Sequence, residues 1–157
     1  MRLNLPKLII SIALCLSIGF LGYFFTVSEI STWYATLNKS SFNPPNWIFA
    51  PVWTILYIFM GISLYLLWTA KKKEKDKDKA MNLFLVQLVL NFFWSVIFFG
   101  MHNPPAAMVE IVALWIFIFI LIRQSLTISK TSAYLLYPYL AWVTFASLLN
   151  LFIVILN

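Results

Sequence analysis

NPPNWIFAPVWTILYIFMG, residues Asn43–Gly61, joins a proline-rich entry to a long apolar run. The pair Pro44–Pro45 suits a helix entry, where an absent N–H costs little and φ is already near the helical value. Pro51 lies further in and removes an i−4 hydrogen bond, so we expect it to kink the helix or to force a restart. Two interpretations are open for the tryptophans beside this helix mouth: the rim of a ligand site, or an interfacial belt around a membrane span.

Composition assigns the chain to a membrane. Of its 157 residues, 62% are hydrophobic, 18% aromatic and 10% charged, whereas a soluble domain is about 45–50% apolar and about a quarter charged. Cys15 is the only cysteine, which excludes a disulfide or a Cys-based metal site within one chain. Six lysines interleaved with three acidic residues occupy positions 71–79. We interpret this run as a solvated loop between two spans, and no nucleic-acid partner is expected.

The sequence predicts an all-α integral membrane protein, a single domain over residues 1–157 that forms a five-transmembrane-helix bundle. Five apolar segments are long enough to cross about 30 Å of hydrocarbon, and they lie at about Leu8–Phe25, Trp47–Trp68, Ala80–Gly100, Pro105–Ile122 and Ala133–Leu156. The first is not interpreted as a signal peptide, because no small-residue cleavage site follows it cleanly. Residues 26–46 form the one long connector, and its aromatic residues predict that it packs as a lid over the helix mouth.

Charge predicts the orientation of the bundle. Ten of the eleven lysine and arginine residues fall on one side of a five-span arrangement, and only Lys39 falls on the other. Because positive residues are enriched in cytoplasmic loops, we expect the N-terminus in the cytoplasm, with loop 26–46 and the C-terminus outside.

Polar and aromatic side chains within the predicted spans gather at one depth. Polar side chains are costly in a membrane, so each needs a reason. From four spans, the outer half receives Trp53 and Tyr57; Asn91, Trp94 and Ser95; Glu110; and Trp142, Phe145, Ala146 and Asn150. Interhelical hydrogen bonds, worth about 0.6–2 kcal/mol each, are one explanation. We favour a pocket, because hydrogen bonding alone does not call for so many indoles at one depth. Glu110 is expected to be protonated, or to accept from an indole N–H or a helix N-terminus.

No conventional catalytic set accompanies this pocket. His102, the only histidine, precedes a proline pair in a short connector and is interpreted as a polar turn residue. The sequence holds no second histidine, CxxC motif, paired carboxylates or glycine-rich phosphate loop, so we expect neither hydrolysis, a metal site nor nucleotide chemistry. Flat indole surfaces, N–H donors and apolar walls suit a planar, greasy ligand with few polar groups at its edge.

Four blocks of the chain carry a resemblance to a known family. They are Trp33-Tyr34 with Leu37 and Lys39, then Pro44–Gly61, then QLVLNFFWSVIFF at Gln87–Phe99, and PYLAWVTFASLLN at Pro138–Asn150. Nearly the whole chain thereby resembles the tryptophan-rich sensory protein/translocator protein family (TspO/MBR), once called the peripheral-type benzodiazepine receptor, as a bacterial member. The resemblance implies five transmembrane helices in a bacterial cell membrane, commonly as a homodimer, with a ligand pocket closed by the first loop.

The resemblance also implies ligands and site residues. By motif position, it places Trp53, Asn91, Trp142, Ala146 and Asn150 in the pocket, and Trp33 and Tyr34 in its lid. Members bind porphyrins such as protoporphyrin IX and haem, the isoquinoline carboxamide PK11195 and, in animals, cholesterol. The tail at 151–157 lacks the tyrosine and basic residue of the animal cholesterol pattern, so sterol binding is not expected. Ser40 stands where many relatives have a proline after the lysine, which predicts a less rigid lid.

Three functions remain open. A porphyrin-binding receptor would sense, buffer or move tetrapyrroles. A photo-oxidase would use the bound porphyrin as its own chromophore, without a further cofactor, and with Trp53 and Trp142 as redox partners; some bacterial relatives are linked to light-dependent breakdown of protoporphyrin IX. The third is a small transporter or a structural bundle, although no internal repeat suggests an alternating-access carrier. The spacings Ala13/Ser17 and Gly19/Gly22 suit either helix packing or a dimer contact.

Overall fold

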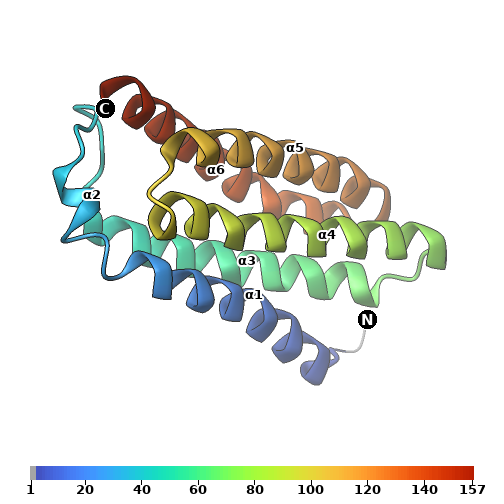
Figure 1. The fold of residues 1–157 in the computed structure, drawn as a ribbon. Helices are drawn as coiled ribbons and strands as arrows, with labels where there is room; N and C mark the ends of the chain where they lie inside the picture. The colour runs from blue at the N-terminus through green and yellow to red at the C-terminus, as the bar shows by residue number, and fades with distance from the viewer. Residues whose placement is uncertain (1–2) are drawn as a thin grey trace.

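The computed structural model describes residues 3–157, which fold into a bundle of five long helices (Figure 1). These are α1 (Leu5–Thr26), α3 (Phe49–Thr69), α4 (Glu74–Ser95), α5 (Pro104–Ile128) and α6 (Lys130–Leu156). Three short elements complete the described part: α2 (Trp33–Thr36), the 3₁₀ helix η1 (Asn46–Ile48) and the π turn η2 (Val96–Gly100). Each long helix is apolar enough to cross a membrane. The predicted all-α, five-helix membrane bundle is confirmed.

The proline-rich stretch enters its helix in two steps. Pro45 has extended backbone (φ −56°, ψ 141°) and precedes η1, and α3 begins directly afterwards at Phe49. Pro51 therefore lies in the first turn of α3, where backbone N–H groups have no partner within the helix. The change from 3₁₀ to α geometry takes place just before the proline, so the chain restarts its helix without losing an interior hydrogen bond.

The charged run at 71–79 is less of a loop than its composition suggests. α4 begins at Glu74, so only residues 70–73 connect α3 to α4. The interpretation of residues 74–79 as a loop is wrong. The acidic side chains of Glu74 and Asp76 lie in the first turn of the helix, where the positive end of the helix dipole stabilises their negative charge. An i,i+3 ion pair between Lys77 and Glu74, 3.1 Å long, adds local support.

Glycines allow the helices to approach closely. A Cβ on Gly61 of α3 would lie 2.5 Å from Ile12 Cα of α1, and a Cβ on Gly19 of α1 would lie 2.4 Å from the Tyr57 ring. A Cβ on Gly22 would meet the Ser95 hydroxyl of α4 at 3.2 Å. Gly19 and Gly22 thus serve packing within the bundle, which accounts for one of the two spacings considered for a dimer. The other, Ala13/Ser17, is exposed.

A chain of buried hydrogen bonds links three helices beneath the lid end of the bundle. Tyr57 of α3 donates to Asn91 Oδ1 of α4, and Asn91 Nδ2 donates to the Tyr139 hydroxyl of α6 at 2.9 Å. Tyr139 in turn donates to Gln87 Oε1 at 3.0 Å. Hydrogen bonding between helices therefore explains why a polar side chain is buried at Gln87. Tyr57 and Asn91 belong to the same network, and their side chains also have a second set of neighbours.

We expect Tyr139→Phe to destabilise the bundle by about 1–2 kcal/mol, because Asn91 Nδ2 and Gln87 Oε1 would each lose a partner in a buried site. Denaturant unfolding in detergent, followed by helical circular dichroism, measures this. Tyr134→Phe on the same helix is the control, since Tyr134 is 60% exposed. Equal stability losses in the two variants would contradict the assigned role of the network.

Candidate ligand-binding cavity beneath the lid

A cavity of about 510 Å³ lies at the end of the bundle that the α1–α3 connector crosses. This connector carries α2 and lies at the far end of α1 from the N-terminus (Figure 1). The volume is within the range of about 300–1,000 Å³ that is usual for small-molecule sites. The five long helices, η1, η2 and the connector all contribute residues to the wall. We call the connector, residues 27–45, the lid.

Most of the predicted pocket residues lie on this wall. They are Tyr34 of the lid, Trp53 and Tyr57 of α3, Asn91 and Trp94 of α4, and Trp142, Ala146 and Asn150 of α6. The Trp53 ring stacks on Tyr57 with centroids 5.6 Å apart and meets Tyr139 edge-on at 6.2 Å. The structure therefore gathers aromatic side chains from separate helices around one space.

Asn150 holds one side of the cavity in place. It is 1% exposed, accepts from Trp94 Nε1 at 3.2 Å, and donates through Nδ2 to the Pro104 carbonyl at 2.9 Å. One amide thus fixes the Trp94 indole and ties α4 and α6 to the start of α5. The indole N–H of Trp142, by contrast, is buried and has no hydrogen-bond partner within residues 3–157. This N–H is covered by protein atoms and is not open to the cavity.

Three of the residues predicted to bind a ligand do not line the cavity. Trp33 packs outside it, stacked on the His102 ring at 4.4 Å and 12°. Phe145 lies behind the wall, 5.6 Å from the Trp142 ring and 6.4 Å from Phe42 of the lid. Both therefore support the lid and the wall from outside, because their rings pack on other aromatic residues instead of facing the open space.

Glu110 is the third residue placed elsewhere. Its neighbour Ile111 lines the cavity, whereas Glu110 does not. Both carboxyl oxygens are buried and have no hydrogen-bond partner among the described residues. The expectation that Glu110 accepts from an indole is therefore wrong: Trp94 donates to Asn150, and Trp115 Nε1 donates to Thr144 at 2.8 Å.

The lid is fixed to the bundle at several points. Tyr34 is 7% exposed and donates to Asn43 Oδ1 at 3.1 Å, and Lys39 Nζ lies 4.7 Å above the Tyr34 ring. Burial raises the pKa of Tyr34, although the Asn43 hydrogen bond opposes this, so the phenol stays a neutral donor. At the other end, Asn38 N donates to Asn157 Oδ1 at 2.9 Å and Asn157 Nδ2 donates back to the Asn38 carbonyl at 3.0 Å.

Two groups of wall residues were not predicted from the sequence. α1 contributes Leu16, Gly19 and Tyr23 to the wall, and only its glycine spacing hinted at close contacts in an otherwise uniform apolar helix. Phe98 and Phe99 also line the cavity, because the π turn η2 widens the end of α4 and turns both rings inward. A single sequence gives no signal for a π turn.

Residues 11–156 match the sequence profile of the TspO/MBR family. The chain is 47% identical over 155 residues to the tryptophan-rich protein TspO of Archaeoglobus fulgidus, covering 99% of each chain. It is 46% identical over 157 residues to the tryptophan-rich protein TspO of Chlorobaculum tepidum, covering 100% of this chain and 99% of the relative. It is also 38% identical over 134 residues to the translocator protein of Homo sapiens, covering 83% of this chain and 78% of the relative.

Proposed function

Since this chain belongs to the TspO/MBR family, we propose that it is a membrane receptor that binds porphyrins in the cavity beneath the lid. One observation carries the proposal: a cavity of about 510 Å³ with Trp53, Trp94 and Trp142 on its wall. Indole faces suit a flat conjugated ring, because aromatic pairs gain energy beyond the area they bury.

The same features support binding of PK11195-type ligands. Such a molecule combines flat aromatic rings with an amide carbonyl, and the cavity offers aromatic walls with few polar groups. Absorbance titration with protoporphyrin IX and with porphyrins of different edge substituents tests the binding proposal. We expect saturable 1:1 binding that PK11195 displaces. Partition that never saturates and equals that into protein-free micelles would contradict it.

The proposal extends to light- and oxygen-dependent breakdown of the bound porphyrin. The ring absorbs the light, molecular oxygen is the oxidant, and the porphyrin is the group oxidised. Trp53 and Trp142 lie on the cavity wall, where their indoles are placed to exchange an electron with the excited ring. This chemistry needs no acid–base pair, in agreement with the side chains that line the cavity.

We expect Trp53→Phe and Trp142→Phe to slow light-driven product formation about tenfold, with a smaller loss of affinity, because phenylalanine keeps the flat surface but is far harder to oxidise. Absorbance spectra recorded during aerobic and anaerobic illumination measure this. Trp47→Phe is the matched control, since Trp47 is 73% exposed. The breakdown step would be contradicted if product formed without oxygen, or if it formed equally fast without the protein. The titration would still test the binding proposal separately.

The alternative within the same family is a tetrapyrrole transporter or stress sensor without turnover. The binding step is common to both, and the illumination experiment separates them.

We further propose that the protein lies in a bacterial cell membrane with the lid outside and the N-terminus in the cytoplasm, on the basis of charge asymmetry along the sequence. We also propose that it forms a homodimer, on the basis of the exposed Ala13/Ser17 pair of α1. A clean monomer at all detergent concentrations would contradict the dimer.

A further inference from the structure

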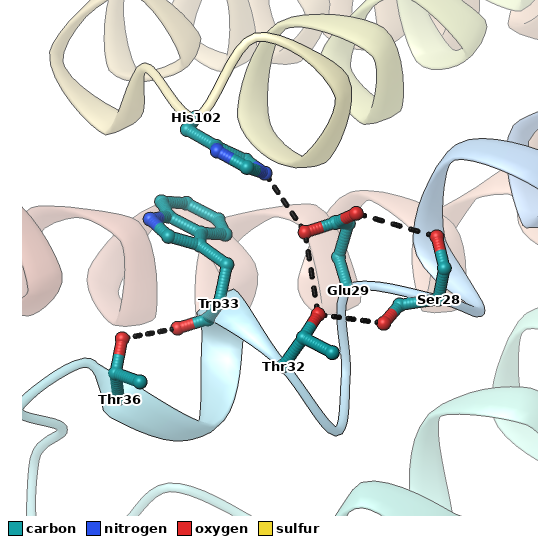
Figure 2. A network of polar contacts seen from close by, with 6 residues as sticks. All are labelled: Ser28, Glu29, Thr32, Trp33, Thr36 and His102. Atoms are coloured by element: carbon teal, nitrogen blue, oxygen red, sulfur yellow. Dashed lines mark hydrogen bonds and ion pairs between the residues drawn. The ribbon is translucent and has the colours of Figure 1, made fainter.

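A histidine from the α4–α5 connector contacts the lid. His102 Nε2 lies 2.8 Å from Glu29 Oε2 of the lid, and the His102 ring stacks on Trp33 of α2 (Figure 2). The His102 side chain is 44% exposed and that of Glu29 is 23% exposed. The two segments are far apart in sequence, so this pair and this stack are a tertiary contact between lid and bundle. We call the three residues the lid clasp.

Both sides of the lid clasp are held in position. Glu29 also accepts from Ser28 Oγ at 3.3 Å and lies 3.5 Å from Thr32 Oγ1 (Figure 2). On the other side, His102 has φ 49°, in the left-handed region that few side chains adopt. This backbone sets the direction of the Cα–Cβ bond of His102, and the stack on Trp33 orients the imidazole ring.

The lid clasp is connected to the cavity. The Glu29 carbonyl accepts from the Tyr34 backbone N–H at 2.8 Å, and Tyr34 lines the cavity. Trp33 packs edge-on against Phe98 at 5.5 Å, and Phe98 also lines the cavity. Opening the clasp would therefore release the backbone that carries the Tyr34 ring over the ligand space.

We propose that His102 is a positioning residue for the lid: in its protonated form it holds Glu29 and slows the escape of a ligand from the cavity, so that ligand residence depends on pH. The proposal rests on the proposed binding function. Histidine is the side chain that ordinarily changes charge between about pH 5 and 8. At acidic pH the contact is a charge-assisted ion pair. At alkaline pH it is a weaker neutral hydrogen bond, and the lid opens more often.

The groups around His102 make Glu29 its charge partner. The lid presents Glu29 and the Trp33 ring to the imidazole, and η2 presents the apolar Phe98 and Phe99 behind Trp33. The lid cation, Lys39, lies over Tyr34 instead. The sign of the effect follows from this set: raising the pH removes the positive charge of His102, leaves only a neutral hydrogen bond to Glu29, and shortens residence.

Stopped-flow release of a porphyrin dimethyl ester into excess PK11195 tests the proposal, since this porphyrin has no carboxylates to titrate. For a partly exposed ion pair, we expect release from the wild-type protein to be about two- to fivefold faster at pH 8 than at pH 5.5. Glu29→Gln and His102→Asn should both release fast at each pH. Asparagine is chosen because it tolerates the left-handed backbone at position 102.

His102→Arg distinguishes a charge effect from a merely structural one. Arginine is planar, can stack on Trp33 and keeps its charge at all these pH values, so release should be slow at both pH values. A wild-type release rate that does not change with pH, or a His102→Arg variant that retains the wild-type pH dependence, would overturn the proposal.

A ligand-free measurement separates this proposal from the binding function. A nitroxide on Ala35→Cys, an exposed position of α2, reports lid motion by electron paramagnetic resonance, with the buried Cys15 replaced by alanine in every sample. We expect a more mobile spectrum at pH 8 than at pH 5.5, and a mobile spectrum at both in His102→Asn. If no porphyrin binds but the label responds in this way, the clasp stands and the binding proposal fails. If porphyrin binds and the label is equally mobile at both pH values, the clasp fails alone.

Discussion

Ala146→Trp is expected to weaken protoporphyrin IX binding about 100-fold or more, equivalent to about 2.7 kcal/mol. Ala146 lines the cavity from α6, next to the turn that carries Trp142. An indole placed there would occupy part of the roughly 510 Å³ that a flat ring needs. The backbone of α6 has no reason to change, because position 146 faces open space on the cavity side. Absorbance titration gives the dissociation constants.

The same substitution elsewhere on α6 is the control for Ala146→Trp. Ala141 is exposed and does not line the cavity, so Ala141→Trp should bind with the wild-type affinity. Helical circular dichroism of both variants shows whether the bundle is intact. Unchanged affinity in a folded Ala146→Trp protein would place the porphyrin somewhere other than this cavity.

Gly61→Ala is expected to give the largest loss of stability, about 3 kcal/mol, which is the upper end of the usual cost of overpacking. The added methyl group would lie 2.5 Å from Ile12 Cα and 3.0 Å from Ile12 N. These are backbone atoms of α1, so no side chain can rotate away and the two helices must separate. Unfolding by denaturant in detergent measures the loss.

Gly22→Ala is the matched control for Gly61→Ala. The added methyl group there meets a serine hydroxyl, Ser95 Oγ, at 3.2 Å, and that side chain can rotate. Alanine also gains about 0.5–1 kcal/mol over glycine inside a helix, so Gly22→Ala should be close to neutral. Equal losses in the two variants would mean that the α1–α3 approach at Gly61 does not limit stability.

The fold could be predicted from the sequence because the membrane imposes strong rules. Helices that satisfy their own backbone groups must be long and apolar, and the five spans follow from that requirement alone. The ends of the helices do not follow from it. α4 begins within the charged run, at Glu74, because exposed charged residues form good helical turns as readily as loops.

The site could be predicted in part, because depth and helical face together bring Trp53, Asn91 and Trp142 to one wall. The misplaced prediction for Glu110 shows that depth in the membrane alone does not identify pocket residues. Depth gives the level of a side chain within the membrane but not the direction in which its helix is turned, and α5 turns Ile111 inward instead. His102 escaped prediction for a different reason: its partner Glu29 is 73 residues away, and no periodic pattern links two loops.

The most direct test of the account is an experimental structure of the protein with protoporphyrin IX bound in a lipid environment. We expect a flat ring enclosed by Trp53 and Trp142, with the lid closed over it through Tyr34 and with Ala146 against its edge. A porphyrin bound on the lipid-facing surface of the bundle, with the cavity filled by lipid or water, would contradict it.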